Sequence, residues 1–215
     1  MTATIVPAST SRWYRNALVS LAVATAAGTA LLVAGEVDPL NQMISDSIRT
    51  VPGAVLLALS ACGLAAAGAW LLAGARRALP RNGMLTALLM VWCASLVVVV
   101  VFPTNLPGTA PGTAAVLHRI GAGLMAALPP LIALLVARLA GRRAESAPVR
   151  RLRTVGWSAL AACAAFAVLN GPAALLDRGL PPFAGLAERI LLVLVLVIVG
   201  LCARVLDGEE RSRWT

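Results

Sequence analysis

Long apolar runs separated by short polar segments dominate the pattern along this chain of 215 residues. Each run approaches the length of about 20 residues that an α-helix needs to cross the hydrocarbon core of a bilayer. The runs do not show the alternating segments of about ten residues that are typical of a membrane β-barrel. Proline and glycine separate the runs, as at Pro52-Gly53 and Phe102-Pro103. We therefore predict six membrane-spanning helices, at about 16–35, 53–74, 83–102, 117–139, 155–176 and 186–206.

This pattern predicts an all-α fold, a polytopic membrane helix bundle with one transmembrane domain over residues 16–206. Residues 1–15 and 207–215 are then short cytoplasmic tails. A signal peptide is the alternative for the first run, because Arg12 and Arg15 precede an Ala-rich apolar stretch. We favour a retained helix, since the run is long for the apolar region of a signal peptide.

The first loop after a span, EVDPLNQMISDSIRTVP, has a helical pattern of its own. Asp38 followed by Pro39 is a typical N-cap and first-turn pair. Apolar residues then recur at helical spacing, at Leu40, Met43, Ile44, Ile48 and Val51. We predict a short amphipathic helix in this extracytoplasmic loop, which either covers the bundle or forms a lid over a cavity between helix ends.

Composition agrees with a membrane protein and supplies its orientation. Hydrophobic residues make up 60% of the chain and charged residues 13%, whereas a soluble chain has about 25% charged residues. All 18 basic residues are arginine, and all but Arg49, Arg119, Arg178 and Arg189 fall on one side of the predicted spans. Because positive residues mark cytoplasmic loops, we predict that both termini lie in the cytoplasm.

The remaining composition narrows the location and the partners. The absence of lysine and the Ala, Val, Leu and Gly bias suggest a GC-rich bacterial genome, hence a bacterial cytoplasmic (inner) membrane. The net charge of +9 does not indicate a nucleic-acid partner, because the arginines are scattered between apolar runs with few aromatic residues among them. The four cysteines lie in four different apolar runs and resemble small buried hydrophobic residues. We expect no metal and no cofactor.

Polar chemistry collects on the outer side of the predicted bundle. We name His118, Glu188 and Asp46 as candidate catalytic residues for acid–base chemistry. Residues that would bind a substrate or pair these charges lie at the same level, namely Arg119, Arg189, Arg49, Asp38, Glu36, Asn105 and Asn170. His118 is the single histidine of the chain, and it opens the fourth predicted span.

Glu188 poses the sharpest question, because a carboxylate one turn into a span needs a cation or a hydrogen-bond donor. The alternative to a ligand site is an ion-paired staple between helix ends. Arg119 and Arg189 need no functional explanation, since arginine near a helix end can extend to the interface. Pro129-Pro130 removes two backbone donors deep in the fourth span, which indicates either a kink that lines a vestibule or a kink satisfied by packing.

Several short motifs resemble those of DUF998, a family of bacterial and archaeal membrane proteins of unknown function. They are Ser45-Asp46, the FPTN of residues 102–105 with Gly108 and His118 after it, and the GLAERI of residues 185–190. The resemblance covers roughly residues 16–206 and implies six spans in the same arrangement. The family usually has an acid where this chain has Asn105, which argues against a shared proton-transfer mechanism at that position.

Three functions remain open. The leading hypothesis is an outward-facing polar pocket that binds a lipid, an isoprenoid or a similar amphiphile, with acid–base chemistry on it left undecided. The second is a structural or accessory membrane subunit, whose outer charges serve as helix-end staples and partner contacts. Small-molecule transport is a weaker third, because polar groups are sparse near the predicted membrane midplane. The expected partners are membrane lipids and a small amphiphilic ligand, with a homo-oligomer or a protein partner as a further option.

Overall fold

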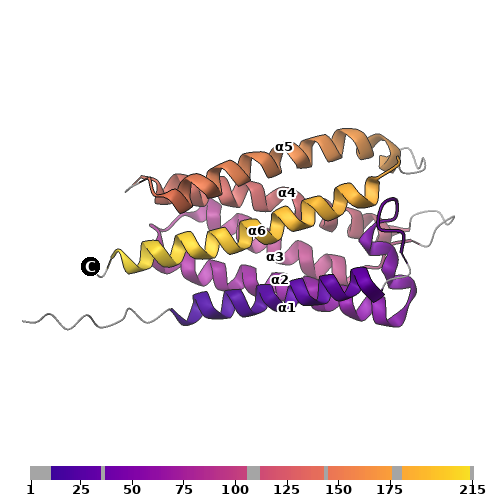
Figure 1. Cartoon of the computed structure of the whole chain (residues 1–215), viewed down its shortest axis with the longest axis horizontal. Coiled ribbons are helices and arrows are strands. Elements are labelled where there is room, and N and C mark those ends of the chain that lie inside the picture. Colours follow the sequence, from indigo (N-terminus) through magenta and orange to yellow (C-terminus); the bar gives the residue numbers. More distant parts are fainter. Residues whose placement is uncertain (1–10, 35–36, 106–111, 143–144, 176–180, 214–215) are drawn as a thin grey trace, which may run out of the picture.

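A computed structural model describes residues 11–34, 37–105, 112–142, 145–175 and 181–213, with the side chains of 172–175 left out. Six long helices lie side by side along one axis (Figure 1). The described elements are α1 (Arg12–Ala34), the 3-10 helix η1 (Ile44–Arg49), α2 (Val51–Ala78), α3 (Gly83–Val101), α4 (Thr113–Ala140), α5 (Ala147–Leu175) and α6 (Ala184–Arg211). All six α-helices are long and apolar enough to cross a membrane, which confirms the predicted fold class.

All the α-helices except α3 extend beyond their predicted spans, because the apolar run is only part of each helix. α5 begins at Ala147, eight residues before the predicted start of the fifth span, and its first turns carry Arg150, Arg151 and Arg153; α6 continues to Arg211. Polar side chains also mark helix starts: the Thr50 hydroxyl accepts the Gly53 N–H, and the Asn82 side chain accepts the Leu85 N–H. Each cap satisfies one of the free N–H groups of a first helical turn.

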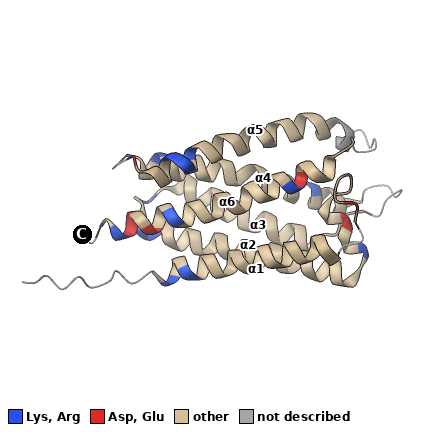
Figure 2. Cartoon of the chain, viewed as in Figure 1, with Lys and Arg blue, Asp and Glu red and all other residues tan. Residues whose placement is uncertain are grey.

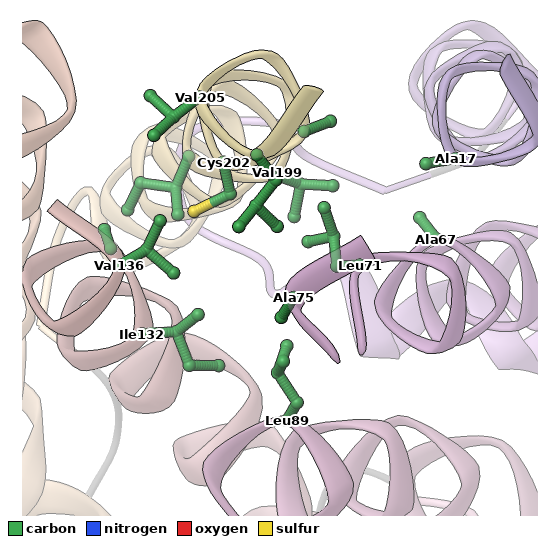
Figure 3. Packing of buried hydrophobic residues seen from close by; sticks show 14 of the residues in the cluster. Ala17, Ala67, Leu71, Ala75, Leu89, Ile132, Val136, Val199, Cys202 and Val205 are labelled. Carbon is green, nitrogen blue, oxygen red and sulfur yellow. The ribbon is translucent and has the colours of Figure 1, made fainter. Parts of the chain in front are cut away.

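Consecutive helices pack against one another, and α6 contacts α1, α2, α4 and α5. This central place explains why α6 is the most buried of the six candidate spans. The core lies between α2, α3, α4 and α6, where Leu71, Leu89, Val136 and Val199 meet (Figure 3). Outward faces keep large apolar side chains exposed, such as Val193 on α6, as is expected of surfaces that face lipid.

Two ends of the bundle can be distinguished. The terminal end holds the first and last described residues, and most arginines gather there (Figure 2). We call the opposite end, which carries η1, the η1 end. At the terminal end α6 is tied to α1: the Asp207 carboxylate accepts the Ser11 hydroxyl at 3.1 Å and pairs with Arg211 at 2.5 Å. The Trp13 indole N–H donates to Glu210 at 2.5 Å.

The proline pair Pro129-Pro130 lies in the part of α4 that side chains of α3 and α5 hydrogen-bond. Each proline lacks the N–H that would bond the carbonyl four residues earlier, so the carbonyls of Met125 and Ala126 are freed. The Trp92 indole N–H of α3 donates to the Met125 oxygen at 3.0 Å, and the Cys163 thiol of α5 donates to the Ala126 oxygen at 3.3 Å. Neighbouring side chains therefore satisfy the proline pair, and α4 stays one helix, which supports the packing alternative for this pair.

The loop helix differs in extent from its prediction. A helix is present in the first loop after a span, but it is a 3-10 helix that begins at Ile44. Asp38 does not cap it, and the expectation that Asp38 and Pro39 open the helix is wrong. The Asp38 carboxylate instead holds a preceding turn, in which it accepts the Leu40 N–H at 2.9 Å and the Asn41 amide at 2.7 Å. Local side-chain bonds of this kind compete with helix formation.

Candidate functional site

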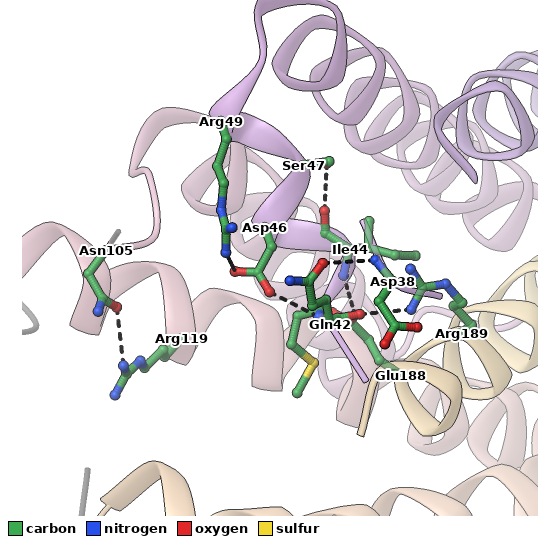
Figure 4. A network of polar contacts seen from close by, with 11 residues as sticks. Asp38, Gln42, Ile44, Asp46, Ser47, Arg49, Asn105, Arg119, Glu188 and Arg189 are labelled. Atoms are coloured by element: carbon green, nitrogen blue, oxygen red, sulfur yellow. Dashed lines mark hydrogen bonds and ion pairs between the residues drawn. The ribbon is translucent and has the colours of Figure 1, made fainter. Parts of the chain in front are cut away.

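The segment from Leu40 to η1 is docked on the first turns of α6 by hydrogen bonds that cross about 140 positions of sequence (Figure 4). The Leu186 N–H donates to the Leu40 carbonyl at 2.9 Å. The Arg189 guanidinium donates to the Gln42 carbonyl at 2.9 Å, and the Glu188 carboxylate accepts the Ile44 N–H at 2.6 Å. These bonds satisfy backbone groups of a short segment that has few partners of its own.

Gly185 makes this close approach possible. A Cβ at this position would overlap with the carbonyl oxygen of Gln42. The preceding turn is held in place by Asn41, whose side-chain oxygen accepts the Phe183 N–H at 3.0 Å. Phe183 adopts the left-handed region, with φ of 65°, which is uncommon for a large residue and is maintained here by its surroundings.

Acidic groups concentrate around this docked segment. Asp46 accepts the Met43 N–H at 3.1 Å and faces Arg49 at 3.5 Å. Asp38 is exposed at the turn before η1, where the Asn41 amide and the Leu40 N–H hold the pKa of its carboxyl below the usual value. Asp38, Asp46, Arg49, Glu188 and Arg189, which were singled out from the sequence, thus belong to one network.

Two members of this network have unused bonding capacity, the Glu188 carboxylate and the buried Arg189 Nε–H, which has no hydrogen-bond partner among the described residues. The Glu188 carboxylate lies between the η1 segment and α6, and the residue is half-buried. The Ile44 N–H is its one hydrogen-bond partner among the described residues. The neighbouring Arg189 directs its Nη1 at the carbonyls of Gln42 and Gly185 rather than at this acid. A half-buried carboxylate at the start of a membrane-spanning helix favours a proton, a cation or a further donor as a partner.

A second cluster joins the end of α3 to the start of α4. His118 is buried, with 3% of its surface exposed, and its Nδ1 lies 2.8 Å from the carbonyl of Phe102, the C-cap residue of α3. A carbonyl accepts only from a protonated nitrogen, so the neutral ring carries its proton on Nδ1 and leaves Nε2 as an acceptor. Arg119 donates to Asn105 at 3.2 Å, and this pair lies apart from the Glu188 network (Figure 4).

Asn170 is a third polar position at the η1 end. It continues the inward-facing seam of α5, which includes Ala159, Cys163 and Phe166. Its amide donates to the Phe166 carbonyl at 3.0 Å, and its buried Oδ1 has no hydrogen-bond partner in the described part of the chain. The predicted site residues therefore occupy one end of the bundle in separate groups, and His118 and Glu188 bond different partners there. Glu36 lies outside the described residues.

Sequence reasoning missed the groups that act through backbone atoms. The donors from Trp92 and Cys163 to the freed carbonyls of α4 follow no local motif. Two hollows also lie at the terminal end, of about 600 and 670 Å³, where no binding site was predicted. Within the described ranges, no group of three or more His, Cys, Asp or Glu residues is placed to hold a metal ion.

Comparison with known families identifies the chain. A family model described as "Protein of unknown function (DUF998)" matches residues 8–205. The chain belongs to the DUF998 family. No curated protein and no solved structure matches it. The matched range of this DUF998 protein includes both polar clusters and Asn170. The ion pair of Asp207 and Arg211 at the end of α6 lies beyond it.

Proposed function

We propose that this multi-pass membrane protein binds an amphiphile, such as a lipid or an isoprenoid, at its η1 end, with the polar head at Glu188. The observation that carries the proposal is the half-buried Glu188 carboxylate, which has a single hydrogen-bond donor, the Ile44 N–H, among the described residues. Natural membrane proteins rarely keep such a group in a span without a partner or a function.

The chemistry at this end favours a head group that donates hydrogen bonds. Glu188, the Asn170 Oδ1 and the His118 Nε2 are all acceptors with unused capacity. A hydroxyl complements these acceptors and also the buried Arg189 Nε–H, a donor without a partner among the described residues, because a hydroxyl both donates and accepts. Acid–base chemistry on the bound molecule is a finer form of the same proposal, with His118 and Glu188 as the proton-transfer groups.

We further propose that the η1 end faces the outside of a bacterial cytoplasmic membrane. Figure 2 supports this orientation, because most arginines gather at the end that holds the first and last described residues. An even number of spans agrees with both termini on one side. Under the positive-inside rule, that side is the cytoplasm.

Native mass spectrometry of the detergent-purified protein tests the binding proposal. We expect a co-purifying small amphiphile with the wild type and its loss in Glu188→Gln. The amide keeps an oxygen for the Ile44 N–H but has no charge and cannot transfer a proton, so the loop remains docked. Glu145→Gln is the matched control, because Glu145 is an exposed acid at the terminal end. Protein without a bound molecule, or equal retention in Glu188→Gln, contradicts the proposal.

A structural or accessory role is the second candidate. It is favoured by the hydrogen bonds of Glu188 and Arg189 to the backbone of the η1 segment, which are staples between helix ends. The same measurement distinguishes the two candidates. An accessory subunit is expected to carry a stoichiometric protein partner, with no small molecule that depends on Glu188.

A further inference from the structure

The hollow of about 600 Å³ at the terminal end lies between the end of α2 and the start of α3. Ala75 and Leu85 form part of its apolar wall. Its polar lining consists of Arg76, Arg81, Asn82 and Thr86, with no acidic residue among the lining residues. The hollow is therefore a concave surface of positive charge.

The two arginines of this hollow and the side-chain amide of Asn82 are available to bind a ligand. Arg76 and Arg81 are exposed and have no hydrogen bond or ion pair within the described residues. Asn82 uses its Oδ1 to cap α3, which leaves its amide N–H groups available. Some other arginines at this end are engaged, since Arg153 pairs with Glu145 and Arg213 donates to the Arg77 carbonyl.

An apolar track leads from the hollow along α3. Ala87 lines the hollow, and Val91 lies one turn further along the same exposed face. Met84 and Val91 are 64% and 46% exposed. A positive head site at a helix end, continuous with an exposed apolar helix face, has the two-part chemistry of a phospholipid site.

We propose that this hollow binds the phosphodiester of an anionic phospholipid, with Arg76 and Arg81 on the phosphate oxygens and an acyl chain along α3. Guanidinium groups form paired, charge-assisted bonds with phosphate. The apolar track favours a lipid over a free phosphate ion, because the ion has no apolar part that could pack against α3. This site is independent of the proposed function, because it lies at the opposite end of the bundle and takes an anionic head group.

Thermal stability in detergent with added lipid tests the site. We expect dioleoyl phosphatidylglycerol to raise the melting temperature of the wild type, and phosphatidylcholine to raise it less. In the double variant Arg76→Gln/Arg81→Gln, the affinity for phosphatidylglycerol should fall about tenfold or more, as the loss of hydrogen bonds between charged groups implies. Arg150→Gln/Arg151→Gln is the matched control, because it removes two exposed arginines at the same end but outside the hollow.

Three results would overturn the proposal. Equal loss in both double variants would show general attraction to the arginine-rich end, and unchanged affinity in Arg76→Gln/Arg81→Gln would exclude the hollow. A full stabilising effect of inorganic phosphate alone would indicate a site for the free ion. If the double variant folds poorly in lipid-free detergent, the single variant Arg81→Gln, in the loop before α3, replaces it, and the same three results apply.

Discussion

Individual hydrogen-bond donors contribute strongly to the stability of this chain, because the surrounding membrane provides no water to replace them. The Trp92 indole N–H is the donor for a carbonyl that Pro129 frees, and it acts through one atom of a buried side chain. His118 has a similar place at the end of α3, where its Nδ1 bonds the Phe102 carbonyl. At the residue scale, these side chains replace backbone donors that the helices lack.

Replacement of Trp92 tests this explanation. We expect Trp92→Phe to lower the free energy of unfolding by about 1–3 kcal/mol, because the Met125 carbonyl is left buried without its donor. Trp157→Phe is the control: Trp157 is 59% exposed on α5, so a change within about 0.5 kcal/mol is expected. Thermal unfolding in detergent measures both variants. Equal effects would show that the indole N–H of Trp92 contributes nothing specific.

At the scale of elements, the distinctive arrangement is η1 and its preceding turn against the start of α6. The contact depends on a glycine on one side and on backbone carbonyls and N–H groups on the other. Arg189 therefore donates to a carbonyl of this backbone segment, and Glu188 accepts one of its N–H groups. This explains why the two charges are adjacent in α6 without pairing to each other.

The contact should fail when Gly185 acquires a side chain. We expect Gly185→Ala to destabilise the protein by about 1–3 kcal/mol and to make the η1 segment sensitive to protease, since the new methyl group displaces Gln42. Gly200→Ala in the same helix is the control, because its Cβ would lie 3.6 Å from a Leu21 methyl group, an ordinary contact. That variant should gain up to about 1 kcal/mol of helix propensity. Comparable behaviour of the two variants would contradict a close approach at Gly185.

At the scale of the whole molecule, the two ends differ in their number of arginines. The terminal end carries most of them and includes the hollow between α2 and α3, although acids such as Glu145 and Asp207 lie there as well. The two proposals accordingly place an anionic lipid at the terminal end and a head group that donates hydrogen bonds at the η1 end.

The orientation of these ends can be measured by cysteine labelling. Thr113 begins α4 at the η1 end and is exposed, and Ser212 is exposed after α6 at the terminal end. In intact cells we expect a membrane-impermeant maleimide to label Thr113→Cys, and to label Ser212→Cys only after permeabilisation. The wild type, whose cysteines lie within the membrane-spanning helices, provides the background. The reverse labelling pattern would place the termini outside.

The sequence by itself determined the six spans, the asymmetry of arginine and the family, because hydrophobic length, charge and short motifs are local properties. It also identified Glu188 as an acid that needs a partner, and it placed the candidate polar residues at one end of the bundle. It did not identify the partner: the sequence offered Arg49, Arg119 and Arg189 to pair the acids at this level, and the structure instead presents the Ile44 N–H.

Only the tertiary structure decided which groups meet. The bond between Ile44 and Glu188 spans 144 positions, and the donors for the freed carbonyls of α4 come from α3 and α5. The groups that bond these side chains are mostly backbone atoms. Every residue carries such atoms, and no residue pattern distinguishes them. The packing of the helices selects among them, and therefore the placement of η1 and the role of the proline pair could not be read from the sequence.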